Sequence, residues 1–222
     1  MRNIVNRYAV FIVGLYFLSL GIVLIVRSAL GSTPVTSVNY VISLFTPLSL
    51  GTCTLIFNIL LITSELCLVG RGGTRREILE IMLQLPFSFV FSVCIDFNMA
   101  LTANVVPTNY LMSLALLAIG CVIQAFGVVL ELKPRVVMMS AEAFVKYVSV
   151  RYNKDFGRVK VGFDVTLVCM AIALSLIMMH RVEGVREGSV IAASVTGFIV
   201  TFLNTRILTR ASLRRLVAPF RR

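Results

Sequence analysis

The sequence has few charged residues, a single histidine and no paired cysteines. Asp, Glu, Lys and Arg make up 14% of its 222 residues, while 58% of the residues are hydrophobic. Soluble domains carry about 25% charged residues. A water-soluble chain of this size has no room to bury so much apolar surface, because small domains leave much of their surface exposed. The scarcity of charge therefore excludes an ordinary soluble domain and predicts a polytopic membrane protein.

Signatures of enzymes, metals and cofactors are also missing. The five cysteines stand singly in apolar runs, with no Cys-X-X-Cys pair. Such cysteines are typical of small buried apolar residues. The sequence contains no HExxH, GxSxG or glycine-rich phosphate-binding motif. We therefore expect no enzymatic activity, no metal and no cofactor.

Six apolar runs are long enough to cross a bilayer, which takes about 20 residues of helix. Two further connections, 28–49 and 132–159, are too long for turns and contain helix-like stretches at 35–45 and 141–150. We expect these connections to be re-entrant or interfacial helices, with solvated loops as the alternative. The six predicted spans are 8–27, 50–69, 80–100, 109–131, 160–180 and 187–207.

The formal net charge of +11 indicates membrane topology and not nucleic-acid binding, because of where the basic residues lie. With the N-terminus in the cytoplasm, 18 of the 21 Lys and Arg residues fall on the cytoplasmic side. The other three, Arg27, Arg181 and Arg186, fall outside. This asymmetry follows the positive-inside rule. It predicts six spans, with both termini and the basic tail in the cytoplasm.

An internal repeat is suggested by a shift of 106 residues, which aligns 14–67 with 120–173 without a gap. Three glycine pairs coincide: Gly14 with Gly120, Gly21 with Gly127, and Gly51 with Gly157. The first and fourth spans would cross in opposite directions, so the halves would be inverted. Inverted repeats are a recurring architecture of secondary transporters. We therefore expect one membrane domain over 1–222, built from a first half at 1–107 and an inverted half at 108–222.

Ionisable residues inside spans are costly and are functional candidates. Asp96 lies in the third span, where helix capping or snorkelling is the structural alternative. Asp164 begins the fifth span, where an ion pair with Lys160 at i−4 is the alternative. The functional interpretation is a carboxylate that binds a cation, a proton or a substrate amine.

Polar residues in repeat-related positions complete the candidate site. Asn58 occupies the position in the first half that Asp164 holds in the second, so the two would face one midplane cavity. Ser140 fits the N-cap of a helix in the second connection, with Glu142 in its first turn. The candidate substrate- or ion-binding residues are Asp164, Asp96, Asn58, Glu142, Lys160, Gln84, Ser32 and Thr33.

Four stretches carry a resemblance to a known family: LQLPFS at 83–88 with FSVCID at 91–96, LGI at 20–22 with 30–34, FGRVKVGFD at 156–164, and GVREG at 184–188. On these stretches the chain resembles the bacterial YczE/YyaS/YitT-type membrane protein family. The chain departs from the family pattern at 139–142, which reads MSAE in place of a Met-Pro-Gly-Glu-like turn, and at Ser189 in place of Thr. The resemblance implies a multi-spanning protein of the bacterial inner membrane and no established substrate.

These observations predict a secondary-transporter-like permease for a small solute, driven by an ion or proton gradient. Its partners would be the lipid bilayer and the solute or ion itself, without nucleic acid. The alternative is a non-transporting accessory or regulatory membrane protein that acts on a partner. In that case Asp164 would pair with Lys160, and Asp96 would lie at the surface.

Overall fold

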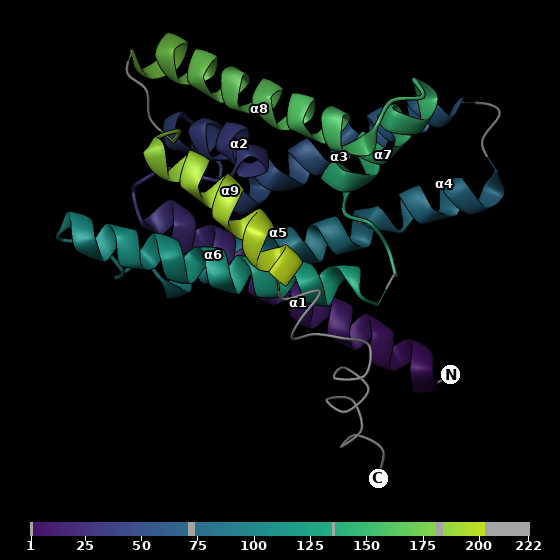
Figure 1. Cartoon of the computed structure of the whole chain (residues 1–222), viewed down its shortest axis with the longest axis horizontal. Helices are drawn as coiled ribbons and strands as arrows, with labels where there is room; N and C mark the ends of the chain where they lie inside the picture. Colours follow the sequence, from purple (N-terminus) through teal and green to yellow (C-terminus); the bar gives the residue numbers. More distant parts are fainter. Residues whose placement is uncertain (1, 71–73, 135, 181–183, 203–222) are drawn as a thin grey trace.

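The computed structural model describes residues 2–70, 74–134, 136–180 and 184–202, and within these ranges it contains helices and no strands. The all-α fold class is therefore confirmed for the described part (Figure 1). The helices are α1 (Arg2–Arg27), α2 (Pro34–Phe45), α3 (Leu50–Val69), α4 (Arg75–Met82), α5 (Gln84–Leu101), α6 (Tyr110–Leu132), α7 (Ser140–Arg151), α8 (Phe156–Met179) and α9 (Glu187–Phe202).

Five of the helical segments are long and apolar enough to cross a membrane. They are Val5–Arg27, Leu50–Val69, Arg75–Leu101, Tyr110–Leu132 and Phe156–Met179. They match the first five predicted spans to within a few residues, as expected for helices that must bury 20 apolar residues in hydrocarbon. The sixth predicted span coincides with α9, and its last residues, 203–207, lie outside the described residues.

The third span is one apolar segment made of two helices. α4 begins with a capping box, in which the Glu77 side chain accepts from the Thr74 amide at 2.8 Å. α4 ends at Met82, and α5 starts two residues later at Gln84. Pro86 explains the break, because its ring has no N–H for a bond to the preceding turn and is tolerated only in the first turn of a helix.

The two long connections contain buried helices of equal length. α2 and α7 have 12 residues each and occupy the stretches that the sequence predicts as helical. Pro34 opens α2 at its first position, where the missing N–H costs nothing. Val38, Val41 and Val145 are nearly inaccessible to solvent. Their burial excludes solvated loops for these two segments.

α1 and α6 form the closest helix pair of the bundle. A Cβ atom added to Gly21 would lie 2.4 Å from the Gln124 nitrogen, and one added to Gly127 would lie 2.3 Å from the Leu18 nitrogen. The same holds towards the helix ends, where Gly14 meets Glu131. As the residue number rises along α1, that of its contact on α6 falls, so the two helices run antiparallel.

The other helices are arranged around this pair (Figure 1). α5 packs against α1 and α3, and α9 packs against α6. α2 packs between α3 and α8, and α7 also contacts both α3 and α8. Figure 1 shows α8 along the edge of the molecule opposite α1 and α6, with α2 and α3 between them.

Candidate functional site

Two polar side chains lie buried on one face of α3. Asn58 is 5% exposed and Glu65 is fully buried. They are seven residues apart, about two helical turns, so they point in the same direction. Asn58 Oδ1 accepts a hydrogen bond of 2.8 Å from the hydroxyl of Ser140, the first residue of α7. The polar face of α3 therefore looks into the bundle, towards α7 and α5.

Gln84 joins this face from the start of α5. The break between α4 and α5 places it at the first helical position, and its side chain is 3% exposed. Gln84 Nε2 donates a hydrogen bond of 2.7 Å to Glu65 Oε2. Ser88, one turn further along α5, is fully buried. We refer to Asn58, Glu65, Gln84 and Ser88 as the inner polar cluster.

Each member of the inner polar cluster has an atom without a partner among the described residues: Asn58 Nδ2, Glu65 Oε1, Gln84 Oε1 and Ser88 Oγ. In a membrane, a polar atom without a partner costs several kcal/mol, roughly, because no water replaces the missing bond. A proton, a cation or a small polar solute would supply what the cluster lacks. The cluster is therefore a candidate binding site.

Two members of the cluster, Glu65 and Ser88, are absent from the candidates that the sequence analysis names. Glu65 is the only acidic residue in 50–69, and it follows the predicted candidate Asn58 by seven residues. That spacing on one helix face was the available signal. Ser88 carries no such signal, because a lone serine in an apolar run is most simply a small residue at a helix contact.

Asp96 lies at the opposite end of α5 from Gln84 and is half-buried. Its Oδ1 accepts a hydrogen bond of 2.8 Å from the Gly51 amide, and its Oδ2 accepts one of 2.7 Å from the Ser49 hydroxyl. Both donors belong to the first turn of α3, where the positive helix end stabilises a carboxylate. Asp96 thus serves as a cap for α3 from a neighbouring helix.

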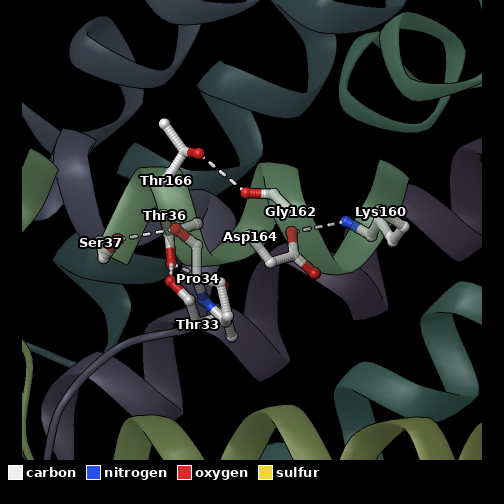
Figure 2. Close-up of polar contacts among 8 residues, drawn as sticks. All are labelled: Thr33, Pro34, Thr36, Ser37, Lys160, Gly162, Asp164 and Thr166. Atoms are coloured by element: carbon white, nitrogen blue, oxygen red, sulfur yellow. Dashed lines mark hydrogen bonds and ion pairs between the residues drawn. The ribbon is translucent and has the colours of Figure 1, made fainter. Parts of the chain in front are cut away.

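Asp164 forms an ion pair with Lys160 one turn earlier on α8, with 2.9 Å between Nζ and Oδ1. Both side chains are partly buried, at 28% and 26% exposure. Figure 2 shows the pair next to the start of α2, where Thr33 and Thr36 share a hydrogen bond between their hydroxyls of 2.7 Å. α2 packs against α8, so Asp164 lies near the connecting helix of the other half of the chain.

Ser32 joins the start of α2 to the segment before α9. Its hydroxyl donates to the Gly184 carbonyl at 2.8 Å, and its amide donates to Ser189 Oγ at 3.1 Å. Ser32 is fully buried, and Thr33 is 7% exposed. Because the Ser32 amide and hydroxyl both have partners within the chain, hydrogen bonds fix the segment at 31–34 against the segment before α9.

Glu142 lies in the first turn of α7 and is half-buried. It is close to Glu131, which is 5% exposed at the end of α6 and bonds to the Met139 backbone. The prediction that Ser140 caps α7 is wrong: the cap position is Met139, without a side-chain bond, and Ser140 bonds to Asn58 instead. The helix therefore starts at Ser140, one residue earlier than a Ser140 cap would give.

A cavity of about 660 Å³ lies where α1, α2, α3 and α5 meet at the Asp96 end. Arg27 lines it, donates a bond of 2.9 Å from Nη2 to the Met99 carbonyl, and has a buried Nε without a partner in the described part. Neither Asn58 nor Asp164 lines this cavity. This cavity is therefore not the common cavity that the sequence analysis predicts for Asn58 and Asp164.

Comparison with known proteins identifies a family and no characterised relative. Residues 5–205 match a protein family described as a family of unknown function, DUF6198. No curated protein and no solved structure matches the chain. The match covers all the described helices apart from the first residues of α1, and it does not bear on the YczE/YyaS/YitT name, which stays a prediction from the resemblance.

Proposed function

We propose that this chain, which belongs to the DUF6198 family of unknown function, is a permease of the secondary-transporter type. It would move a small solute across the membrane, driven by an ion or proton gradient. The observation that carries the proposal is the set of contacts between α1 and α6. Each of these contacts has a counterpart in the same set, which the 106-residue repeat relates to it.

The glycine contacts state this relation most sharply. Gly14 lies against Glu131, and shifting each residue by 106 along the repeat gives the contact of Gly120 with Ile25, which is also present. The contact of Gly21 with Gln124 converts in the same way into that of Gly127 with Leu18. Such reciprocity is the mark of a two-fold axis that relates two surfaces. Because α1 and α6 are antiparallel, it supports inverted halves.

Helix bounds and caps follow the same shift. α7 begins and ends 106 residues after α2, and α8 begins 106 residues after α3. The Ser49 hydroxyl accepts a bond from the Thr52 amide at 3.0 Å, and Asp155 accepts the equivalent bond from the Arg158 amide at 3.1 Å. Packing pairs are exchanged too: α1 with α5 becomes α6 with α9, and α2 with α8 becomes α7 with α3.

One equivalent pair breaks the relation. α3 packs closely against α5, where a Cβ on Gly51 would lie 2.4 Å from the Ser92 carbonyl oxygen. The repeat-related Gly157 would meet only its neighbour Asp155, and α8 and α9 make no comparable contact in the described part. Alternating access requires that two equivalent halves hold different packings and exchange them. The difference between these two helix pairs supports that mechanism.

Membrane orientation and residue roles complete the proposal. The distribution of basic residues favours both termini in the cytoplasm, and the family resemblance favours the bacterial inner membrane. Asp96 and Asp164 would bind a cation or coupling proton, with Lys160 as the resting partner of Asp164. Asn58 and Gln84 would bond to the solute. Ser32, Thr33 and Glu142 belong to segments that would line the path.

Ligand-induced stabilisation of the purified protein tests this function. A solute that binds the folded state raises its stability by RT ln(1 + [L]/Kd), so weak substrates become visible at high concentration. We expect a hit in a panel of small metabolites and ions, lost in Asp164→Asn and kept in Asp155→Asn, which changes the exposed N-cap of the same helix. Stable protein without a hit, or a hit that both variants keep, would contradict the assignment of Asp164.

The second candidate function is a non-transporting accessory protein, and two observations favour it. Asp164 is paired with Lys160 at 2.9 Å, as this alternative expects, and Asp96 has a structural role as a cap of α3, although it is half-buried and not at the surface. Here Asp164→Asn would lower only the amount of folded protein. Solute uptake that is lost at unchanged expression would exclude the alternative.

A further inference from the structure

We infer that Glu65 holds a proton on Oε1 and donates it to Gln84 Oε1, so that the two side chains form a paired acid and amide inside the membrane. This pair is a further site at which a coupling proton of the permease binds and leaves, in addition to the carboxylates Asp96 and Asp164. The second statement rests on the proposed function, whereas the first does not.

The hydrogen-bond pattern carries the first statement. Gln84 Nε2 donates to Glu65 Oε2 at 2.7 Å, and the second oxygen of each group, Glu65 Oε1 and Gln84 Oε1, has no partner in the described part. Both are acceptors when Glu65 is ionised. One proton on Glu65 turns its Oε1 into a donor and satisfies both atoms at once. Rotating the amide by half a turn would bring its oxygen against Glu65 Oε2, and a proton would again be needed.

No ion pair replaces the proton on Glu65 in the described part: Arg76 pairs with Glu80, and Lys146, whose charge acts on Glu65, is exposed. Glu65 is fully buried, and an ionised carboxylate in such a place is tolerated only when paired. The charged groups and tyrosines on the packed elements are Glu142, Lys146, Tyr147 and Arg151 on α7, Arg75, Arg76, Glu77 and Glu80 on α4, Asp96 on α5 and Tyr40 on α2. The Lys146 side chain is exposed, with its ammonium 5.7 Å from the centre of the Tyr147 ring.

Loss of the proton would weaken the packing of α3 against α5, which is the contact that differs between the two halves. The proton leaves to water as H⁺, the bond to Gln84 Oε1 is lost, and the remaining carboxylate draws water or a cation to the inner polar cluster. Gln84 is the first residue of α5, directly after the break at Leu83, so the pair joins α3 to the point where the third span changes from α4 to α5. Release of the proton would therefore weaken the packing of α3 against α5. The equivalent pair in the other half, α8 and α9, already lacks a comparable contact in the described part.

Infrared spectroscopy of the protein in lipid vesicles tests the protonation without a solute. The spectrum of the wild type minus that of Glu65→Gln should contain a carboxylic-acid carbonyl band at neutral pH, which shifts in D₂O. Glu80→Gln removes an exposed carboxylate and should give only carboxylate bands. If Glu65→Gln also gives only carboxylate bands at neutral pH, Glu65 is ionised and the inference is wrong.

A second variant keeps the inference testable if Glu65→Gln does not fold. Gln84→Met retains Glu65 but removes its partner, so the carbonyl band of Glu65 should move to the higher frequency of an acid without that bond. An unmoved band would overturn the pairing. Transport is scored separately: a protonated Glu65 in a protein that takes up no solute refutes the permease, and proton-coupled uptake with an ionised Glu65 refutes the coupling role.

Discussion

Gly21 and Gln124 meet so closely that a Cβ atom on the glycine would lie 2.4 Å from the Gln124 backbone nitrogen and 2.5 Å from its Cα. No side chain separates α1 from α6 at this point. Small residues that let helix backbones approach are the usual basis of association between membrane helices, because lipid gives no hydrophobic force to hold helices together. The Gly21 contact and its counterpart at Gly127 therefore hold the two halves of the chain together.

Gly21→Ala should destabilise the protein by about 1–3 kcal/mol, the usual cost of an added methyl group in a packed contact. Gly127→Ala should cost about the same, because it sits in the equivalent contact with Leu18. Thermal unfolding in detergent measures both. Gly162→Ala is the control: no atom lies within 4 Å of its Cβ position, so helix propensity should leave it unchanged or more stable. Equal effects at all three positions would contradict the close crossing.

The fold was largely predictable from the sequence, because span length and charge position depend on local composition. Helices α2 and α7 followed from the breakers and apolar residues around 34 and 140. The division of the third span at Leu83 was missed, although Pro86 was visible, because a proline inside an apolar run does not reveal whether the helix kinks, breaks or continues. Tertiary contacts decide that outcome.

The candidate site was less predictable, because hydrogen-bond partners depend on packing between distant segments. Asn58 and Gln84 were predicted as separate candidates, but no spacing rule places Gln84 against Glu65 or Asn58 against Ser140. Asp96 was correctly associated with helix capping as an alternative, but its target, the start of α3, lies 45 residues away. A carboxylate in a membrane span carries an energetic penalty that the sequence reveals. Only the packing shows which contacts offset that penalty.

Asp96→Ala should lower stability by about 0.5–2 kcal/mol, the usual cost of a lost helix cap. Asp96→Asn should cost less, because an amide oxygen still accepts from the Gly51 amide. Thermal unfolding of the two variants separates capping from ion binding. Asp155→Ala, which removes the exposed cap of α8, provides the scale. A loss of ligand response in Asp96→Asn with unchanged stability would assign Asp96 to binding instead.

Lys160 and Asp164 should show a measurable coupling. The pair is partly buried at 2.9 Å, so a double-mutant cycle of Lys160→Met and Asp164→Asn should give about 0.5–1 kcal/mol, the upper range for such pairs. The cycle compares the free energies of unfolding of the two single variants and the double variant. The exposed pair Arg76–Glu80 should give less. A coupling energy of zero between Lys160 and Asp164 would mean that Lys160 does not stabilise Asp164.

Lys133 should make stability rise at alkaline pH. Burial lowers the pKa of its ammonium below the ordinary 10.5, and its Nζ has no partner among the described residues. The charged form therefore disfavours folding below the lowered pKa, and this cost fades as pH rises towards the ordinary value. Lys133→Met should raise the melting temperature at neutral pH, with a gain that shrinks at high pH. The exposed Lys154→Met should show no such trend.

The two connections after α5 and α7 should lie on opposite sides of the membrane. Eighteen of the 21 basic residues fall on one side if the chain crosses six times, and the asymmetry is lost if it crosses five times. Single cysteines test on which side of the membrane each connection lies. They are introduced at the exposed positions Thr108 and Tyr152, in a chain whose native cysteines are replaced. An impermeant maleimide added to intact spheroplasts should label Thr108→Cys, and label Tyr152→Cys only after lysis. Labelling of both before lysis would refute the inverted arrangement, because Thr108 and Tyr152 would then be separated by an even number of crossings.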